Sequence, residues 1–377
     1  MGRGRSLRGK KGLPRRLALA GVTGCLLLIA LGCSPALGSP AIDQPAAASS
    51  VFDDSDPAVL VDGTNFYLFG SSNNMKVPVR QITSFTASLA TSQTDWAQHP
   101  HDAMPTRPAW VNTADTAIWA PTVAKLGSTY VMWFAGHRTG ATDVGNDQCI
   151  GRATSDTPMG PYTPDSAPIY CGLPPEAGSN PWGRGALDPS EITDPNTGNI
   201  YLLVALSRTQ DNIGAIQLDS SGNVPGGINA TATVLASVKF PWHDGVDDGT
   251  LNSPAFLENP SMIYEPNTKT FLLFYSAGQW NTSHYLTGFG RCATPTGPCT
   301  LDSRGPFLQG GNGRSGPGGL TTFTDPNTGA LRVAYSSWTS GFEAQTGPVG
   351  QYSRQVSWGT LTVTATADPS AQSISLS

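Results

Sequence analysis

The stretch DPSEITDPNTGNIYLLV at residues 188–204 decides the fold. It contains a short mixed run, a Pro-Asn-Thr-Gly turn and a second run rich in Leu, Val and Tyr, which is the pattern of a β-hairpin. Four other segments repeat the plan, each opening on a residue followed by proline. They begin at Asp56-Pro57, Ala120-Pro121, Asn259-Pro260 and Gly316-Pro317.

The spacing of these five segments predicts an all-β, five-bladed β-propeller. Their prolines lie 64, 68, 71 and 57 residues apart, and units of about sixty residues suit four short strands each. An array of β-sandwiches is the structural alternative, but it would not repeat the residue-proline start in every unit. We expect Tyr352–Thr364 to return to the N-terminal segment and close the ring.

Charge is scarce and unevenly distributed along the 377 residues. Asp, Glu, Lys and Arg make up 13 % of the chain, and the formal charge is −5. Residues 1–42 hold seven cations and no acid, so the remainder carries 15 Lys and Arg against 27 Asp and Glu, a net charge of −12. Such a surface repels phosphate backbones, so we expect no nucleic-acid partner.

Residues 1–40 are predicted to be an export signal, and residues 41–377 a single propeller domain. A basic stretch precedes the uncharged run Leu17–Gly32, which is short for a membrane span of ~20 residues. Leu31-Gly32-Cys33 is similar to a bacterial lipobox, so Cys33 is a candidate for lipidation, while ordinary cleavage near Ala36 or Ala41 stays open. The protein is therefore expected to be secreted or anchored as a lipoprotein on the cell exterior.

The four cysteines beyond the signal are predicted to form disulfides, as an even number in an exported protein indicates. We favour Cys149–Cys171 and Cys292–Cys299, because each pair brackets a turn-rich segment of similar sequence. A zinc site is disfavoured, since the chain has no C-x-x-C motif and no matching pair of histidines.

Three of the five segments carry a carboxylate at or beside the proline, namely Asp56, Asp188 and Glu258. In a propeller the first strands of all blades surround one axis, so these side chains should converge on one site. Paired carboxylates across a cleft suit glycoside hydrolysis, in which one acts as acid and another as base. Asp-Pro can also be plain turn chemistry, which is how we interpret Asp194 and Asp325 in the hairpin turns.

The motifs together resemble glycoside hydrolase family 43, whose members are five-bladed propellers that act on glycans containing arabinose or xylose. The resemblance spans residues 51–364 and is carried by DPAVLVDGTNFYLFGS (56–71), IWAPTV (118–123), IGRATSDTPMGPY (150–162), LDPSEITDPNTGNIYLL (187–203) and LENPSMIY (257–264).

The resemblance implies a role for each acidic residue of the trio. Asp56 would be the general base, Glu258 the general acid, and Asp188 the residue that tunes the pKa of the acid. A glutamate reaches farther toward a leaving group than an aspartate, which agrees with this assignment. The resemblance also implies inversion by direct attack of water, with the Asp56 and Glu258 carboxyl groups ~6.5–9.5 Å apart.

The sequence departs from the resembled family at two places. Many relatives have Gly-Pro-Gly-His in the fifth blade, whereas Gly316-Pro317-Gly318-Gly319 lacks the histidine. We therefore predict no metal in the channel, and no other cofactor is expected. Asn259 follows the predicted acid where a small residue is common, and it either bonds the substrate or only shapes the loop.

Aromatic side chains near the segment starts are the candidates for sugar binding, because sugars stack on aromatic rings. The predicted substrate-binding residues are Trp119, Asn259, Trp182, Trp280 and His284. His243 is a further histidine that would line the cleft if its loop is exposed.

Two other functions stay open alongside an inverting arabinofuranosyl or xylosyl hydrolase. Retaining fructan- and sucrose-cleaving propellers usually have Asn before the first Asp-Pro and Arg before the second, where this chain has Ser55 and Leu187. A non-catalytic glycan-binding propeller is the other alternative, and the intact acidic trio counts against it. The expected partner is a plant-type or cell-wall glycan, and we expect a monomer.

Overall fold

The computed structural model describes residues 42–43, 55–72, 75–82, 101–139, 148–172, 185–207, 212–245, 251, 255–345, 354–364 and 373–377. All of them belong to one structural unit, Gly38–Ser377. The predicted export signal with Cys33, and also Trp182, lie outside the described residues. In the described part of the chain, no helix has the length and apolar character needed to cross a bilayer.

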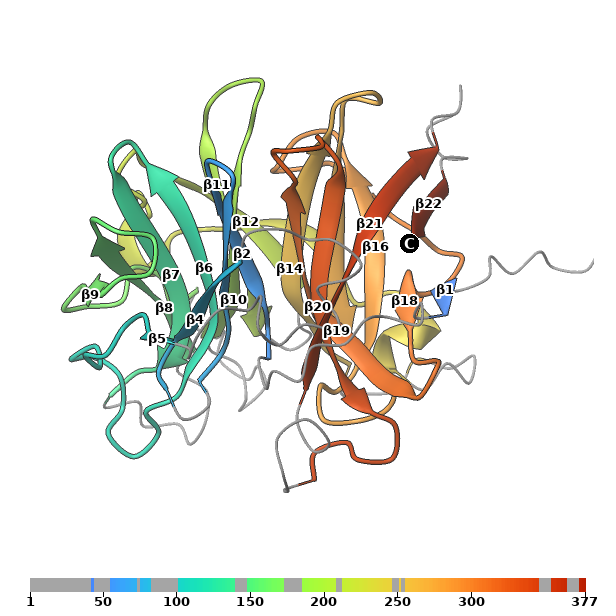
Figure 1. Ribbon diagram of the computed structural model, residues 1–377, viewed down its shortest axis with the longest axis horizontal. Coiled ribbons are helices and arrows are strands. Elements are labelled where there is room, and N and C mark those ends of the chain that lie inside the picture. The colour runs from blue at the N-terminus through green and yellow to red at the C-terminus, as the bar shows by residue number, and fades with distance from the viewer. Residues whose placement is uncertain are drawn as a thin grey trace, which may run out of the picture. The chain divides into compact units, whose positions relative to one another are not determined.

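The described elements are β-strands except for two short 3-10 helices, η2 (Gly227–Asn229) and η3 (Pro241–Asp244). The described strands, labelled in Figure 1, pair into four sheets. The eight-stranded sheet contains two antiparallel groups joined by a single parallel pair, Gly185 with Gln148, so the strands make five antiparallel groups in chain order. The first is β2 (Ala58–Asp62), β3 (Asn65–Phe69), β4 (Pro78–Ile82) and β5 (His101–Asp102). The second is β6 (Ile118–Leu126), β7 (Thr129–His137), β8 (Gln148–Ser155) and β9 (Thr163–Pro164). The third is β10 (Gly185–Thr193), β11 (Ile200–Ser207), β12 (Asn212–Leu218) and β13 (Thr233–Ser237).

The last two groups follow the same plan. The fourth is β14 (Leu257–Glu265), β15 (Thr270–Ala277) and β16 (Leu286–Cys292), with β17 (Cys299–Leu301) and β18 (Leu308–Gln309) both paired to β16. The fifth is β19 (Arg314–Thr324), β20 (Leu331–Thr339), β21 (Gln355–Thr364) and β22 (Ser373–Leu376).

The first strands of the groups contact one another in a closed cycle. β2 packs beside β6, β6 beside β10, β10 beside β14, β14 beside β19, and β19 returns to β2. Sheets repeated radially around their first strands form a β-propeller, so the predicted fold class is confirmed. Each group is therefore one blade, and its first strand faces the ring axis.

The second strand of a blade is buried along almost its whole length. In β7, seven of nine residues are buried, and β15 is buried at every position after Thr270. Each blade is covered on both faces by its neighbours, so these strands cannot alternate apolar and polar residues as a half-exposed strand does. This explains the continuous apolar runs YVMWFAG (130–136) and FLLFYSA (271–277).

The expected closure of the ring by Tyr352–Thr364 is wrong. β21 pairs with β20 and with β22, which lies at the C-terminus of the chain, so the fifth blade is complete without N-terminal residues. The N-terminal strand β1 (Ile42–Asp43) instead pairs in parallel with β18 of the fourth blade. Apolar packing joins the first and fifth blades, where the rings of Phe66 and Phe323 meet edge to face at 6.0 Å.

The acids of the Pro-Asn-Thr hairpin turns are structural, as the sequence indicated for Asp194 and Asp325. In each turn the side chain accepts the backbone N–H of the asparagine two residues later, an arrangement typical of turns. The pairs are Asp194 with Asn196 (2.9 Å), Glu265 with Asn267 (3.1 Å) and Asp325 with Asn327 (3.0 Å). Burial alone would raise the pKa of Glu265 and Asp325, but hydrogen bonds outweigh it and lower both pKa values, chiefly those from Thr268 to Glu265 and from the Asn327 N–H to Asp325.

His243 is a core residue and does not line a cleft. Its side chain in η3 is fully buried, and its Nδ1 accepts the backbone N–H of Lys239 at 3.1 Å. Its Nε2 lies 3.1 Å from the hydroxyl of Tyr275. Burial lowers the pKa of His243 to about 4, with the nearby Asp244 acting in the opposite direction.

Protonation of His243 should therefore destabilise the fold in mild acid. The folded-state pKa lies below the value of ~6.5 in an unfolded chain, so the stability is complete above pH ~6.5 and is lost as pH falls toward 4. We expect the free energy of unfolding to fall by up to about 3 kcal/mol over this window. Urea unfolding of the wild type and His243→Gln at several pH values measures the slope. Equal slopes for both proteins would contradict this account.

Candidate active site

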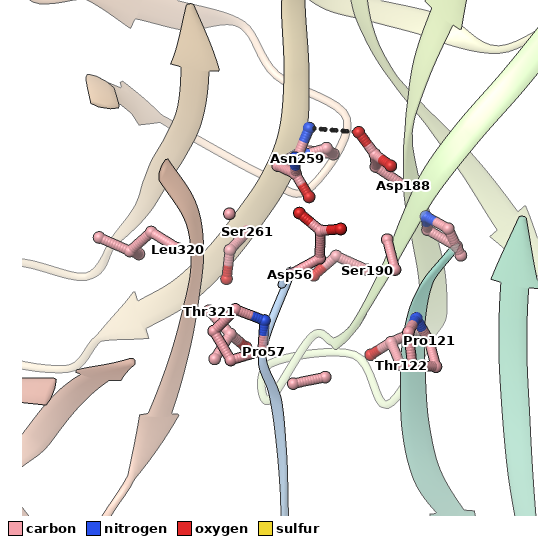
Figure 2. Close-up of a pocket in the computed structure, with 15 residues that line it drawn as sticks. Asp56, Pro57, Pro121, Thr122, Asp188, Ser190, Asn259, Ser261, Leu320 and Thr321 are labelled. Carbon is pink, nitrogen blue, oxygen red and sulfur yellow. Dashed lines mark hydrogen bonds between the residues drawn. The ribbon is translucent and has the colours of Figure 1, made fainter. Parts of the chain in front are cut away.

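One tripeptide from each blade lines a pocket on the ring axis (Figure 2). The tripeptides are Asp56-Pro57-Ala58, Ala120-Pro121-Thr122, Asp188-Pro189-Ser190, Asn259-Pro260-Ser261 and Gly319-Leu320-Thr321. Four of them are residue-proline pairs from the repeated segments of the sequence. The repeat therefore marks the positions at which the blades meet at the axis.

The first residue of every tripeptide has a left-handed backbone. The φ angles are 50° at Asp56, 42° at Ala120, 52° at Asp188, 49° at Asn259 and 61° at Gly319. Where these residues lie inside a strand, the antiparallel register breaks and two residues leave the ladder. Asp, Asn and Gly tolerate this region best. Each non-glycine position stores ~1–3 kcal/mol of strain, which the surrounding sheet must hold.

The structure corrects the position of the fifth segment start. The sequence placed it at Gly316-Pro317, but the pocket residue is Gly319, followed by Leu320 in place of a proline. A Cβ atom at Gly319 would lie 3.0 Å from Oδ1 and 3.1 Å from Cα of Asp56. Only glycine fits this close approach without displacing Asp56. In the fourth blade the residue equivalent to Asp56 is Asn259, as the sequence predicted, and Glu258 lies one residue earlier.

Asp56 is half-buried and is oriented by the neighbouring blade. The Ser71 hydroxyl donates to Asp56 Oδ2 at 2.6 Å, and the Ser71 hydroxyl oxygen accepts the backbone N–H of Ala120 at 2.8 Å. Ser71 thus connects the first blade to the start of β6. The other carboxylate oxygen of Asp56 lies beside Gly319.

Asp188 is the most buried of the three acids, with 5 % of its surface exposed. Its Oδ2 accepts the backbone N–H of Asn259 at 3.0 Å, which joins the third blade to the fourth (Figure 2). Figure 2 shows the Asp56 carboxylate directed toward the space between Asn259 and Asp188. Two anionic side chains therefore share one small pocket.

Glu258 lies at the start of β14, and its Oε1 accepts a 2.6 Å hydrogen bond from the hydroxyl of Tyr285. Tyr285 is buried, with 1 % of its surface exposed. Burial and then the charge of Glu258 raise the pKa of Tyr285 well above its usual value, and Asp56 and Asp188 add to the shift. Asp56 and Asp188 line the pocket, and Glu258 directly precedes the pocket residue Asn259, so the structure places the three predicted acids near one another.

Arg354 is a site residue that the sequence analysis missed. Its guanidinium is buried and donates to the carbonyl oxygens of Trp280 (3.0 Å), Gly316 (3.2 Å) and Ser336 (2.8 Å). It lies 5.1 Å from the centre of the Tyr285 ring. Arg354 stands directly before β21 and belongs to no recognisable motif, so no pattern in the sequence indicated that it lies beside the acids.

The predicted sugar-binding residues fall in different environments. Asn259 lines the pocket. Trp119 does not line it; this side chain is partly buried and meets His137 edge to face at 4.7 Å. Trp280 is 54 % exposed and stacks on Trp338 at 6.2 Å. His284 is exposed, and Trp182 lies outside the described residues.

The pocket offers no evident site for a metal ion. Within the ranges that the structure describes, no group of three or more His, Cys, Asp or Glu side chains is arranged to hold a metal. The fifth blade contributes Gly319, Leu320 and Thr321, none of which has an imidazole, carboxyl or thiol group. The residues of this pocket do not fit the metal-bound water that the fifth-blade histidine of related propellers can hold.

Solved structures of similar fold include glycoside hydrolases of low sequence identity. An α-L-arabinofuranosidase from Lactobacillus brevis is 16 % identical with a TM-score of 0.61, over 85 % of this chain and 92 % of that one. An endo-1,4-β-xylanase from Bacteroides thetaiotaomicron is 17 % identical with a TM-score of 0.62, over 88 % and 96 %. An α-L-arabinanase from Cellvibrio cellulosa is 16 % identical with a TM-score of 0.58, over 82 % and 92 %.

The family assignment comes from the sequence itself. No curated protein matches the chain significantly. The profile described as glycosyl hydrolases family 43 matches residues 50–356, which include all five tripeptides of the pocket. The chain therefore belongs to glycosyl hydrolase family 43, a family of glycosidases.

Proposed function

We propose that the protein is an exported glycosidase that cleaves arabinofuranosyl or xylosyl linkages in polysaccharides or oligosaccharides with inversion of configuration. The observation that carries the proposal is that Asp56 and Asp188 line the axial pocket, while Glu258, which directly precedes the pocket residue Asn259, accepts a hydrogen bond from the buried phenol of Tyr285. The arabinofuranosidase, arabinanase and xylanase among the solved neighbours support the sugar class.

In the proposed reaction Asp56 is the general base and Glu258 the general acid. Asp56 takes a proton from a water molecule, whose oxygen forms a bond to the anomeric carbon. The bond from that carbon to the leaving-group oxygen breaks, and its electron pair stays on the oxygen, which accepts the proton of Glu258. One water is consumed, and two hydroxyl-bearing products form.

Asp188 is proposed to favour the protonated form of Glu258. A second anion near a carboxyl group disfavours its ionisation, and Asp188 is fixed by the backbone N–H of Asn259, the residue after Glu258. Its burial limits the screening of its charge by water. The peptide bond between Glu258 and Asn259 therefore connects the proposed acid to the N–H group that holds Asp188.

Trp280 is the strongest of the proposed sugar platforms. Its ring is exposed, whereas its carbonyl oxygen accepts bonds from Trp338 Nε1 at 2.9 Å and from Arg354 at 3.0 Å. The backbone is thus fixed, and stacking on Trp338 holds the ring. Trp280 follows β15, which pairs with the strand β14 that holds Glu258. We therefore assign Trp280, and His284 on the same loop, to the part of the site that binds the leaving group.

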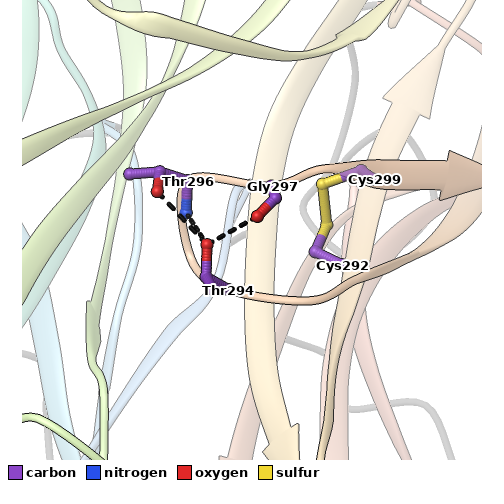
Figure 3. Close-up of a disulfide and its surroundings, with 5 residues drawn as sticks. All are labelled: Cys292, Thr294, Thr296, Gly297 and Cys299. Atoms are coloured by element: carbon purple, nitrogen blue, oxygen red, sulfur yellow. Dashed lines mark hydrogen bonds between the residues drawn. A yellow bond between two sulfur atoms is a disulfide. The ribbon is translucent and has the colours of Figure 1, made fainter.

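The described cysteines support export, because both predicted disulfides are present and disulfides persist in oxidising compartments. They join Cys149 to Cys171 and Cys292 to Cys299. The second closes a hairpin in which the Thr294 hydroxyl donates to the carbonyl oxygen of Gly297 at 2.6 Å (Figure 3). Export by a signal over residues 1–40, with or without a lipid on Cys33, remains our proposal. Mass spectrometry of the mature N-terminus distinguishes the two forms.

Replacing the proposed general acid or general base should strongly reduce turnover without unfolding the protein. We expect Glu258→Gln and Asp56→Asn each to lower kcat/KM by about 10²- to 10⁴-fold, the usual contribution of general acid–base catalysis. The assay is hydrolysis of aryl arabinofuranosides, aryl xylosides, arabinans and xylans. The matched control is Asp165→Asn, which removes a carboxylate paired with Arg152. Wild-type rates in both site variants would contradict the assignment.

The stereochemical course separates this proposal from a retaining mechanism. NMR of the first-formed sugar should show the anomer opposite to that of the substrate, before mutarotation mixes the two. A product of unchanged configuration would indicate a covalent intermediate and would overturn the inverting mechanism. Binding of the same glycans without any turnover would favour the non-catalytic alternative.

A further inference from the structure

We propose that Tyr285 is a positioning residue that fixes which oxygen of Glu258 carries the transferable proton. The inference rests on the proposed function, because it assumes that Glu258 is the general acid. Nothing in the repeated motifs pointed to Tyr285, which follows His284 on the loop between β15 and β16.

The direction of the Tyr285 hydrogen bond follows from its two partners. The Asn259 side-chain amide donates to the phenol oxygen at 3.0 Å, and the phenol lies 2.6 Å from Glu258 Oε1. A phenol has one hydrogen. Because its oxygen already accepts from Asn259, that hydrogen is available for Glu258, so Oε1 is committed as an acceptor. The proton that Glu258 donates is therefore carried by Oε2.

The phenol ring is held in place on two sides. The Arg354 guanidinium lies 5.1 Å from its centroid. A Cβ atom at residue 318 would lie 2.1 Å from Cε1 of Tyr285, so Gly318 is in contact with the ring and no other residue fits there. With 1 % of its surface exposed, Tyr285 has little freedom to turn away from Glu258.

This geometry assists proton donation as well as orientation. When Glu258 gives up its proton, negative charge develops on its carboxyl group, and hydrogen bonds to ionised groups are stronger than neutral ones. Burial and the charge of Glu258 raise the pKa of Tyr285 well above its usual value, so the phenol stays a donor. The other charged groups facing this phenol are Arg354, Asp56 and Asp188.

The test uses leaving groups of different quality, because only poor leaving groups require the acid. We expect Tyr285→Phe to lower kcat/KM about 10- to 100-fold on an alkyl glycoside and less than about 3-fold on a dinitrophenyl glycoside of the same sugar. Loss of a donor to the carboxylate disfavours its ionised form, so the alkaline limb of the pH–rate profile should move to higher pH.

The matched control is Tyr130→Phe, which removes another phenol–carboxylate bond, the 2.6 Å bond from Tyr130 in β7 to Asp62 at the end of β2. It should change neither the leaving-group dependence nor the pH profile. Equal losses on both substrates, or an unmoved alkaline limb, in a folded Tyr285→Phe protein would overturn the inference.

A second variant keeps the test decisive if Tyr285→Phe does not fold. Asn259→Gly allows the left-handed backbone and removes the side-chain amide that donates to the phenol. Because Asn259 also lines the pocket, the readout is the leaving-group dependence and not the overall rate, and this dependence should shift in the same direction. An unshifted dependence would overturn the inference. If Glu258→Gln loses more activity on the alkyl glycoside than on the dinitrophenyl glycoside and these variants do not, only the role of Tyr285 is misassigned. If Glu258→Gln shows no such difference, the proposed function fails.

Discussion

The left-handed backbone at the axial end of each blade is the constraint on which the site depends. A regular strand would keep its side chains on the two faces of the blade, between neighbouring sheets. In the third and fourth blades the bulge takes two residues out of the ladder and brings the first of them to the axis, as at Asp188 and Asn259, whereas Asp56 reaches the axis just before β2 begins. The strain is tolerable because these positions hold Asp, Asn or Gly, with Ala120 as the exception.

The polar groups of the site also hold the blades together. Among the described residues no hydrogen-bonded strand pair joins the first and last blades, which meet through apolar packing such as that of Phe66 on Phe323. Polar side chains link the other neighbouring blades. Ser71 connects the first two blades, the Asp188–Asn259 bond connects the third and fourth, and Ser276 accepts the N–H of Gly319 at 3.0 Å between the fourth and fifth. Catalytic placement and ring stability are therefore coupled.

The repeat in the sequence predicted the propeller and the convergence of three acids, because blades impose the same local pattern five times. It failed where a residue's role depends on contacts between blades. Gly319 was missed because a close approach to Asp56 replaces the proline used elsewhere. Arg354 and Tyr285 were missed because each is marked only by its buried contacts, Tyr285 with Glu258 and Arg354 with the Tyr285 ring, and such contacts leave no local pattern in the sequence. The ring closure was wrong because β22, at the C-terminus, already covers β21.

The most direct test of the central claim is a crystal structure of Glu258→Gln with an arabinose- or xylose-containing oligosaccharide. The account predicts the scissile linkage over the axial pocket, with its glycosidic oxygen within hydrogen-bond reach of residue 258. It also predicts a water on Asp56 at the opposite face of the sugar and a separation of ~6.5–9.5 Å between the two side-chain termini. A separation of ~5–5.5 Å, or a sugar bound away from the axis, would contradict it.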